Sequence, residues 1–193
     1  MILPIVAYGH PVLKKVAQHI TPDYPGLQQL IDNMWETMYN GHGVGLAAPQ
    51  VGLDIRLFVV DSEQLLEDAD DDGDSKFRLT KGIRKVFINA EIVEESGEPW
   101  TYEEGCLSIP EVRVKIARPE TLRIKYVDEQ FQEHMETYNE MNARIIQHEY
   151  DHIQGVLLTD HMSPLKKSLV KKKLDNIASG KVGVRYKMKF AQR

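Results

Sequence analysis

One stretch decides the fold of this chain: residues 141–155 read MNARIIQHEYDHIQG. Spacings of four, three and four residues separate Met141, Ile145, His148 and His152. Residues at such spacings share one face of an α-helix, and a glycine such as the last residue of the stretch commonly follows a helix end. The stretch therefore predicts a helix that carries two apolar residues and two histidines on the same face.

The segment from His148 to His152 has the pattern H-E-x-x-H. Two histidines four residues apart on a helix can bind one metal ion, and Glu149 beside them can take a proton from water. The alternative interpretation is a helix with two surface or capping histidines. Because the histidines continue an apolar face, and a buried imidazole without a partner costs free energy, the pattern favours a metal site.

The third metal ligand is not supplied just downstream, because residues 153–158 contain neither Glu nor His. A thermolysin-like peptidase would supply a Glu downstream, and a metzincin would supply a His in an H-x-x-G-x-x-H extension. Upstream lies Cys106, the only cysteine, between Gly105 and Pro110, where we expect a strand to meet a loop. A thiolate with two imidazoles leaves one coordination position open, as a catalytic metal requires, whereas a structural site would need a fourth protein ligand.

The composition predicts one domain in a reducing compartment. The 193 residues suffice for one core, and a single cysteine excludes an intramolecular disulfide framework, so we expect a cytoplasmic location. A net charge of -5 argues against a DNA-binding protein. No apolar run approaches the roughly 18 residues of a membrane helix, so we expect no membrane association. The N-terminus also lacks the basic region and cleavage site of a signal peptide.

Charge is unevenly distributed along the chain. Residues 61–74 carry eight acids and no Lys or Arg, and we expect a solvated loop there. From Ser163 onward the chain carries ten Lys plus Arg and one acid, which is a net charge of +9. Ser163 followed by Pro164 is typical of a helix N-cap and first helical residue, so this basic segment is expected to begin as a helix.

The remaining pattern is that of one more helix and a series of strands. Apolar residues from Leu27 to Met38 recur at helical spacing, and Gly41 follows them. Segments rich in Val, Ile, Tyr and Phe predict strands at 55–61, 85–95, 111–117, 121–128 and 131–139. Because a helix, the strands and two further helices follow one another without alternating, the sequence favours an α+β fold with antiparallel strands.

Three segments together resemble the motifs of the peptide deformylase family, in the family's order: GVGLAAPQ (43–50), EGCLS (104–108) and HEYDH (148–152). The resemblance extends to ILPIVAYGHPVL (2–13) and covers nearly the whole chain. It implies that residues 1–193 are a single catalytic domain, with antiparallel strands around a central metal-binding helix and a basic C-terminal helix from about residue 163. It also implies the reaction, which is removal of the formyl group from formyl-methionine on nascent polypeptides with release of formate.

The resemblance further implies a role for each residue of the site. The metal ligands would be Cys106, His148 and His152, with Glu149 as general base. Gln50 and the backbone N–H of Leu107 would stabilise the oxyanion. The cofactor would be one divalent metal ion, Fe²⁺ in most members, which Ni²⁺, Co²⁺ or Zn²⁺ can replace.

Substrate contacts are also expected from the resemblance. Val44, Met141 and Ile145 would line an apolar pocket for the methionine side chain, and the backbone of Gly45 would pair with the peptide. Ordinary core packing explains these residues equally well. Arg113 resembles a family arginine and is expected to pair with Glu104 near the site; the alternative is a solvated charge on a strand.

The basic C-terminal helix has two interpretations. It can be a solvated face, or it can dock on the ribosome as in some bacterial deformylases, since its charge would attract the phosphate backbone. Two other functions also remain consistent with these residues. One is a metallopeptidase that cleaves internal peptide bonds, and the other is a non-enzymatic, metal-stabilised module that binds ribosomes.

Overall fold

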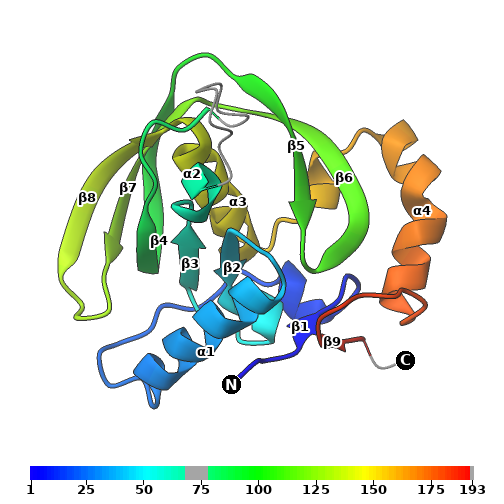
Figure 1. The fold of residues 1–193 in the computed structure, drawn as a ribbon, viewed down its shortest axis with the longest axis horizontal. Helices are drawn as coiled ribbons and strands as arrows, with labels where there is room; N and C mark the ends of the chain where they lie inside the picture. The colour runs from blue at the N-terminus through cyan, green and yellow to red at the C-terminus, as the bar shows by residue number, and fades with distance from the viewer. Residues whose placement is uncertain (68–77, 192–193) are drawn as a thin grey trace.

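The computed structural model describes residues 1–67 and 78–191 (Figure 1). The α-helices are α1 Leu27–Asn40, α2 Gln64–Glu67, α3 Glu140–Ile153 and α4 Pro164–Ala178. The strands are β1 Ile5–Val6, β2 Gly45–Ala47, β3 Leu57–Asp61, β4 Arg84–Ser96, β5 Trp100–Cys106, β6 Ile109–Arg118, β7 Thr121–Val127, β8 Glu133–Asn139 and β9 Met188–Lys189. They form an antiparallel sheet in the order β2-β3-β4-β7-β8, an antiparallel hairpin β5-β6 and a short parallel pair β1-β9.

Helix α3 lies in the middle of the molecule, between the large sheet and the β5-β6 hairpin (Figure 1). It contacts β2, β3, β7 and β8 on one side. On the other side, Arg144 donates to the carbonyl of Ile116 in β6, and Gln147 donates to that of Pro119. Antiparallel strands therefore surround a central helix, which confirms the predicted α+β class.

The end of α3 explains why a glycine follows it. Gly155 has a φ of 72°, the left-handed region that favours glycine. A Cβ at this position would lie 2.7 Å from the carbonyl oxygen of Lys14. The chain thus turns sharply after the helix and passes close to the N-terminal segment.

Strand β3 is buried on both faces because a helix covers each of them. Phe58 and Val60 pack in the same cluster as Ile145 of α3. Leu57 and Val59, which alternate with them, pack with residues of α1 in a second cluster. This double burial is why the strand reads as a continuous apolar run instead of an alternating one.

The helix signals of the sequence are confirmed at both ends of the chain. Helix α1 is followed by the predicted glycine, Gly41, whose N–H donates to the carbonyl of Thr37. Helix α4 begins at Pro164, and the side chain of Ser163 accepts from the N–H of Lys166.

Of the expected acidic loop, residues 68–74 lie outside the described residues. The expectation is wrong for Asp61, which ends β3, is buried and accepts a hydrogen bond from Tyr39. It is also wrong for Gln64–Glu67, which form the short helix α2.

Strand β5 was not among the predicted strands, although it positions the site. Its residues Tyr102, Glu104 and Cys106 occupy alternate positions, which places them on one face of the strand. A carboxylate in the middle of that face interrupts the apolar alternation on which strand prediction depends.

Within residues 1–67 and 78–191, no helix is both long and apolar enough to span a lipid bilayer.

Candidate metal centre

Three side chains from two elements meet beside α3. Cys106 ends β5, and His148 and His152 lie one turn apart on α3. Their ligand atoms all lie within 4.8 Å of one another, and the Cys106 Sγ and His152 Nε2 atoms are 3.3 Å apart. A tetrahedral ion with ordinary metal–sulfur and metal–nitrogen bonds separates such atoms by about 3.6 Å. The donor set and its spacing therefore fit one first-row divalent ion.

Glu104 orients the first histidine. Its Oε2 lies 2.9 Å from His148 Nδ1, so the other ring nitrogen is left free to face the thiol. The same carboxylate accepts a bidentate pair from Arg118, at 2.7 and 3.0 Å, and a further bond from Arg144. Burial would raise the pKa of Glu104, but the hydrogen bonds from His148 and Arg118 outweigh it and hold that pKa far below its usual range.

Burial favours the neutral form of the second histidine. His152 is fully buried, and desolvation, with the positive charges of His148 and Arg118, holds its pKa well below the ordinary value. A metal binds the neutral imidazole, so this burial favours the state that a ligand needs. For His148, burial opposes the charged form, but hydrogen bonds with Cys106 and Glu104 raise its pKa above the ordinary value, and a metal would have to displace that proton.

The expected ion pair between Arg113 and Glu104 is wrong. In the β5-β6 register Glu104 lies opposite Val114, so it shares the face of β6 on which Ile116 and Arg118 also lie. Arg113 lies on the other face, opposite Gly105, and a Cβ added to Gly105 would lie 3.0 Å from the guanidinium of Arg113. The arginine of β6 that pairs with Glu104 is Arg118. Side chains alternate between the two faces of a strand, and Arg113 and Arg118 are an odd number of positions apart, so they lie on opposite faces.

Gln50 presents its amide nitrogen to the metal centre. Its Oε1 accepts from the backbone N–H of Ala47 at 2.8 Å, which fixes which end of the amide is oxygen. Nε2 consequently points the other way and lies 3.6 Å from Cys106 Sγ and 3.5 Å from Ser108 Oγ. The 3₁₀ turn Ala48–Val51 after β2 holds the side chain in this direction.

Glu149 is buried next to the ligands and is housed by a glycine. Among the described residues its Oε2 has no hydrogen-bond partner, and burial raises its pKa to about 7. A Cβ on Gly45 would lie 2.5 Å from Glu149 Oε1. The absence of a side chain at position 45 is therefore what leaves room for this carboxyl group.

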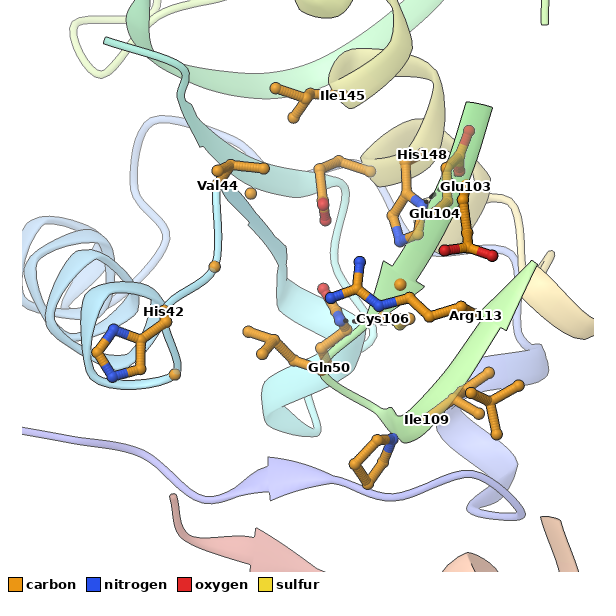
Figure 2. Close-up of a pocket in the computed structure, with 18 of the residues that line it drawn as sticks. His42, Val44, Gln50, Glu103, Glu104, Cys106, Ile109, Arg113, Ile145 and His148 are labelled. Atoms are coloured by element: carbon orange, nitrogen blue, oxygen red, sulfur yellow. Dashed lines mark hydrogen bonds and ion pairs between the residues drawn. The ribbon is translucent and has the colours of Figure 1, made fainter. Parts of the chain in front are cut away.

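A cavity of about 680 Å³ opens in front of these groups. Figure 2 shows the side chains of Val44 and Ile145 at one end, and Cys106, Gln50 and Arg113 around the centre. The residues expected from the sequence to contact the substrate all line it: Val44, Gly45, Glu104, Arg113, Met141 and Ile145. Leu107, Cys106, His148 and Glu149 line it as well, so the sequence named residues that the fold brings to one cavity.

Three polar residues around the site were not expected from the sequence. Arg144 and Arg118 neutralise Glu104, and Arg118 also pairs with Asp151 at 2.9 Å. Arg144 lies four residues before His148 and therefore on the same face of the helix. A positive charge at that position was a signal in the sequence that an acidic partner lies near the histidines. Tyr186 lines the cavity from the far C-terminal segment, and no local pattern marks it.

An α+β fold that brings a Cys/His₂ ligand set and a buried carboxyl group together beside one cavity defines a metal-dependent hydrolase. A sequence model of the polypeptide deformylase family matches residues 2–168. The chain belongs to this family and is thus an enzyme that removes the formyl group from the N-terminus of nascent polypeptides.

Individual relatives support this assignment over nearly the whole chain. The peptide deformylase of Christiangramia forsetii is 56% identical over 190 residues, which are 98% of this chain and 96% of the relative. A peptide deformylase structure from Legionella pneumophila is 36% identical with a TM-score of 0.76, covering 94% of this chain and 98% of that one. Peptide deformylase 1B of Arabidopsis thaliana, in complex with an inhibitor, is 30% identical with a TM-score of 0.78, covering 93% of this chain and 92% of that one.

We expect the change Glu104→Gln to weaken metal binding by about 10- to 100-fold. A neutral amide no longer orients His148 by charge, and it leaves Arg118 and Arg144 buried with less negative charge around them. Competition for the metal with a chelator of known affinity measures the effect. The control is Glu103→Gln on the neighbouring, exposed residue. Equal metal affinity in both variants would show that Glu104 does not hold His148 in the orientation that binds the metal.

Proposed function

We propose that Cys106, His148 and His152 hold one divalent metal ion, natively Fe²⁺, which Ni²⁺, Co²⁺ or Zn²⁺ can replace. The observation that carries the proposal is the convergence of the three ligand atoms within 4.8 Å at the edge of a cavity that also contains Glu149. One thiolate and two imidazoles suit several first-row ions. When bound, the metal lowers the pKa of water towards neutrality and polarises a carbonyl group.

Glu149 is the general base in this proposal. A buried carboxyl group whose pKa is about 7 can accept a proton from the attacking water near neutral pH and return it to the amine that leaves. Gln50 Nε2 and the N–H of Leu107 would donate to the oxygen of the formyl group as negative charge develops on it. The fixed orientation of the Gln50 amide supports that role.

The formyl-methionine end of the peptide would occupy the cavity. Val44, Met141 and Ile145 supply apolar surface for the methionine side chain, and Gly45 offers backbone groups at the edge of β2. Arg113 would contact the part of the bound peptide that extends out of the cavity. Glu104 would act on the substrate through His148, since its carboxylate is already occupied by two arginines.

The test is formate release from formyl-Met-Ala-Ser by protein purified without oxygen, with the bound metal determined in the same preparation. We expect one metal ion per chain, iron in the anaerobic preparation, and formate as the product without cleavage of internal peptide bonds. Internal cleavage would instead support a metallopeptidase. A metal that is bound without any formate release would support a binding module.

We also propose that residues 1–193 act as one catalytic domain in the cytoplasm. The parallel pairing of β1 with β9 joins the two ends of the described chain. A reducing compartment would preserve the thiolate of Cys106, because oxidation of the sulfur removes a metal ligand.

A second part of the proposal concerns helix α4, which would attach the enzyme to ribosomes. Its lysines at 166, 167, 171, 172 and 173 are exposed, and so are the apolar side chains of Leu165 and Leu169. Cationic side chains attract the phosphate backbone, and this attraction weakens as the salt concentration rises.

Replacing Lys166, Lys167, Lys172 and Lys173 by glutamine is expected to abolish salt-dependent co-sedimentation with ribosomes while formate release from a short peptide stays normal. A matched control replaces the exposed Lys15, Lys81, Lys115 and Lys125, which lie outside the basic C-terminal segment, by glutamine. Unchanged co-sedimentation of the α4 variant would refute ribosome docking through this helix and leave the catalytic proposal intact.

A further inference from the structure

Residues 181–191 return from α4 towards the cavity, and we call them the C-terminal strap. Its strand β9 pairs with β1, where Ile5 N–H donates to Lys187 O and Ala7 N–H to Lys189 O, both at 2.8 Å (Figure 1). The apolar residues Val182, Met188 and Phe190 of the strap pack against the core cluster that contains Cys106. The family match ends at residue 168, so the strap lies beyond the region that it covers.

Tyr186 connects the strap to the metal centre. Its hydroxyl donates to the backbone carbonyl of Leu107 at 2.8 Å, and its side chain lines the cavity. Burial, with a contribution from the charge of Cys106, raises the pKa of Tyr186 to about 12, so the phenol remains a hydrogen-bond donor at neutral pH.

The hydrogen-bonded carbonyl belongs to the turn that carries the thiol. Cys106 and Ile109 pair directly across the hairpin, so Leu107 and Ser108 form a two-residue turn between β5 and β6. The carbonyl of Ser108 accepts from the N–H of Tyr8 at 2.8 Å. Both carbonyls of the turn are therefore held by groups outside the hairpin, one by the N-terminal segment and one by the strap.

Holding these two carbonyls restricts the turn. When the carbonyl of Leu107 is held, the planar peptide group that joins Leu107 to Ser108 is held with it, so the Leu107 N–H can change direction only through the two backbone dihedrals of Leu107. A turn of two residues has few backbone dihedrals left to vary once its two carbonyls are bound. A donor or ligand that is misplaced by about 1 Å can cost on the order of 10² in rate.

We propose that Tyr186 is a positioning residue for deformylation, which holds the Leu107–Ser108 turn so that the thiolate of Cys106 stays directed towards His148 and His152 and the Leu107 N–H stays directed towards the reacting formyl group. The inference rests on the proposed roles of Cys106 and Leu107. It adds a part of the chain beyond the family match to the catalytic apparatus. Because the oxyanion forms only in the transition state, loss of the restraint lowers kcat and leaves KM unchanged.

The test compares Tyr186→Phe with the matched control Tyr24→Phe. Each change removes one phenolic hydroxyl and keeps the ring, and Tyr24 packs in the cluster around α1, away from the cavity. Formate release from formyl-Met-Ala-Ser is measured per bound metal ion. For Tyr186→Phe we expect kcat to fall by about 3- to 10-fold, the loss of one buried hydrogen bond, with KM unchanged. Tyr24→Phe should match the wild type.

A second measurement reports the turn without turnover. In protein loaded with Co²⁺, the thiolate-to-cobalt absorption band depends on the direction of Cys106, so Tyr186→Phe should shift this band and Tyr24→Phe should not. An unchanged kcat and an unchanged band would overturn the inference. A fall in kcat that is explained entirely by lost metal would also overturn it, because the role would then be structural only.

The proposed function and the role of Tyr186 can be refuted separately. A wild-type protein that binds metal but releases no formate would contradict the proposed function. A fully active wild type whose Gln50→Ala variant loses activity, together with a Tyr186→Phe variant that equals the wild type, would contradict only the role of Tyr186.

Discussion

The change Glu149→Ala is expected to lower kcat for formate release by about 10²- to 10⁴-fold while the protein keeps its metal. The carboxyl group is buried, and its pKa is raised to about 7, which suits a group that takes a proton and returns it near neutral pH. It is not one of the three converging ligands, so its removal should leave the donor set complete. Metal content and formate release, measured on the same preparation, test both halves of the prediction.

Two further variants sharpen this result. Glu149→Gln keeps the size of the side chain beside Gly45 and removes only its ability to accept a proton, so it should be as inactive as the alanine variant. Glu103→Gln, on an exposed carboxylate at the rim of the cavity, tests whether any nearby loss of charge has the same effect. Near-normal turnover in a metal-replete Glu149→Ala protein would refute the general-base role.

The change Cys106→Ser is expected to weaken metal binding by on the order of 10²- to 10³-fold. This factor corresponds to the contribution of one ligand to the binding free energy of a zinc site. Serine is nearly the same size, so packing in the cluster with Val6 and Ile109 should be retained. Its hydroxyl stays protonated at neutral pH and cannot replace the thiolate. Formate release should fall with the metal content.

Metal analysis after dialysis against a weak chelator tests this change, and a thermal unfolding curve of the metal-free proteins serves as the control for folding. His134→Ala, at a histidine paired with Asp128 on the β7-β8 side of the sheet, controls for the loss of an unrelated metal-binding side chain. A serine variant that retains one tightly bound metal ion per chain would exclude Cys106 from the ligand set.

The predicted helices were correct because their signals are local. In α3, residues at spacings of three and four must share a face whatever surrounds them, so the two histidines could be placed together without any knowledge of the fold. In α4, the serine that caps the helix and the proline that opens it act within one turn of chain. Strand β5 was missed because its inward face carries Glu104, whose favourable environment comes from two distant arginines.

The sequence by itself determined the α+β class, the family and the residues with the chemistry for a metal site, since motif spacing and side-chain type are properties of the chain alone. Only the tertiary structure decided which arginine of β6 meets Glu104, because the strand register selects Arg118 and directs Arg113 to the opposite face. It alone also brought Tyr186 to the Leu107 carbonyl, across 79 positions of sequence. Such contacts depend on how separate elements pack, and no local pattern encodes that packing.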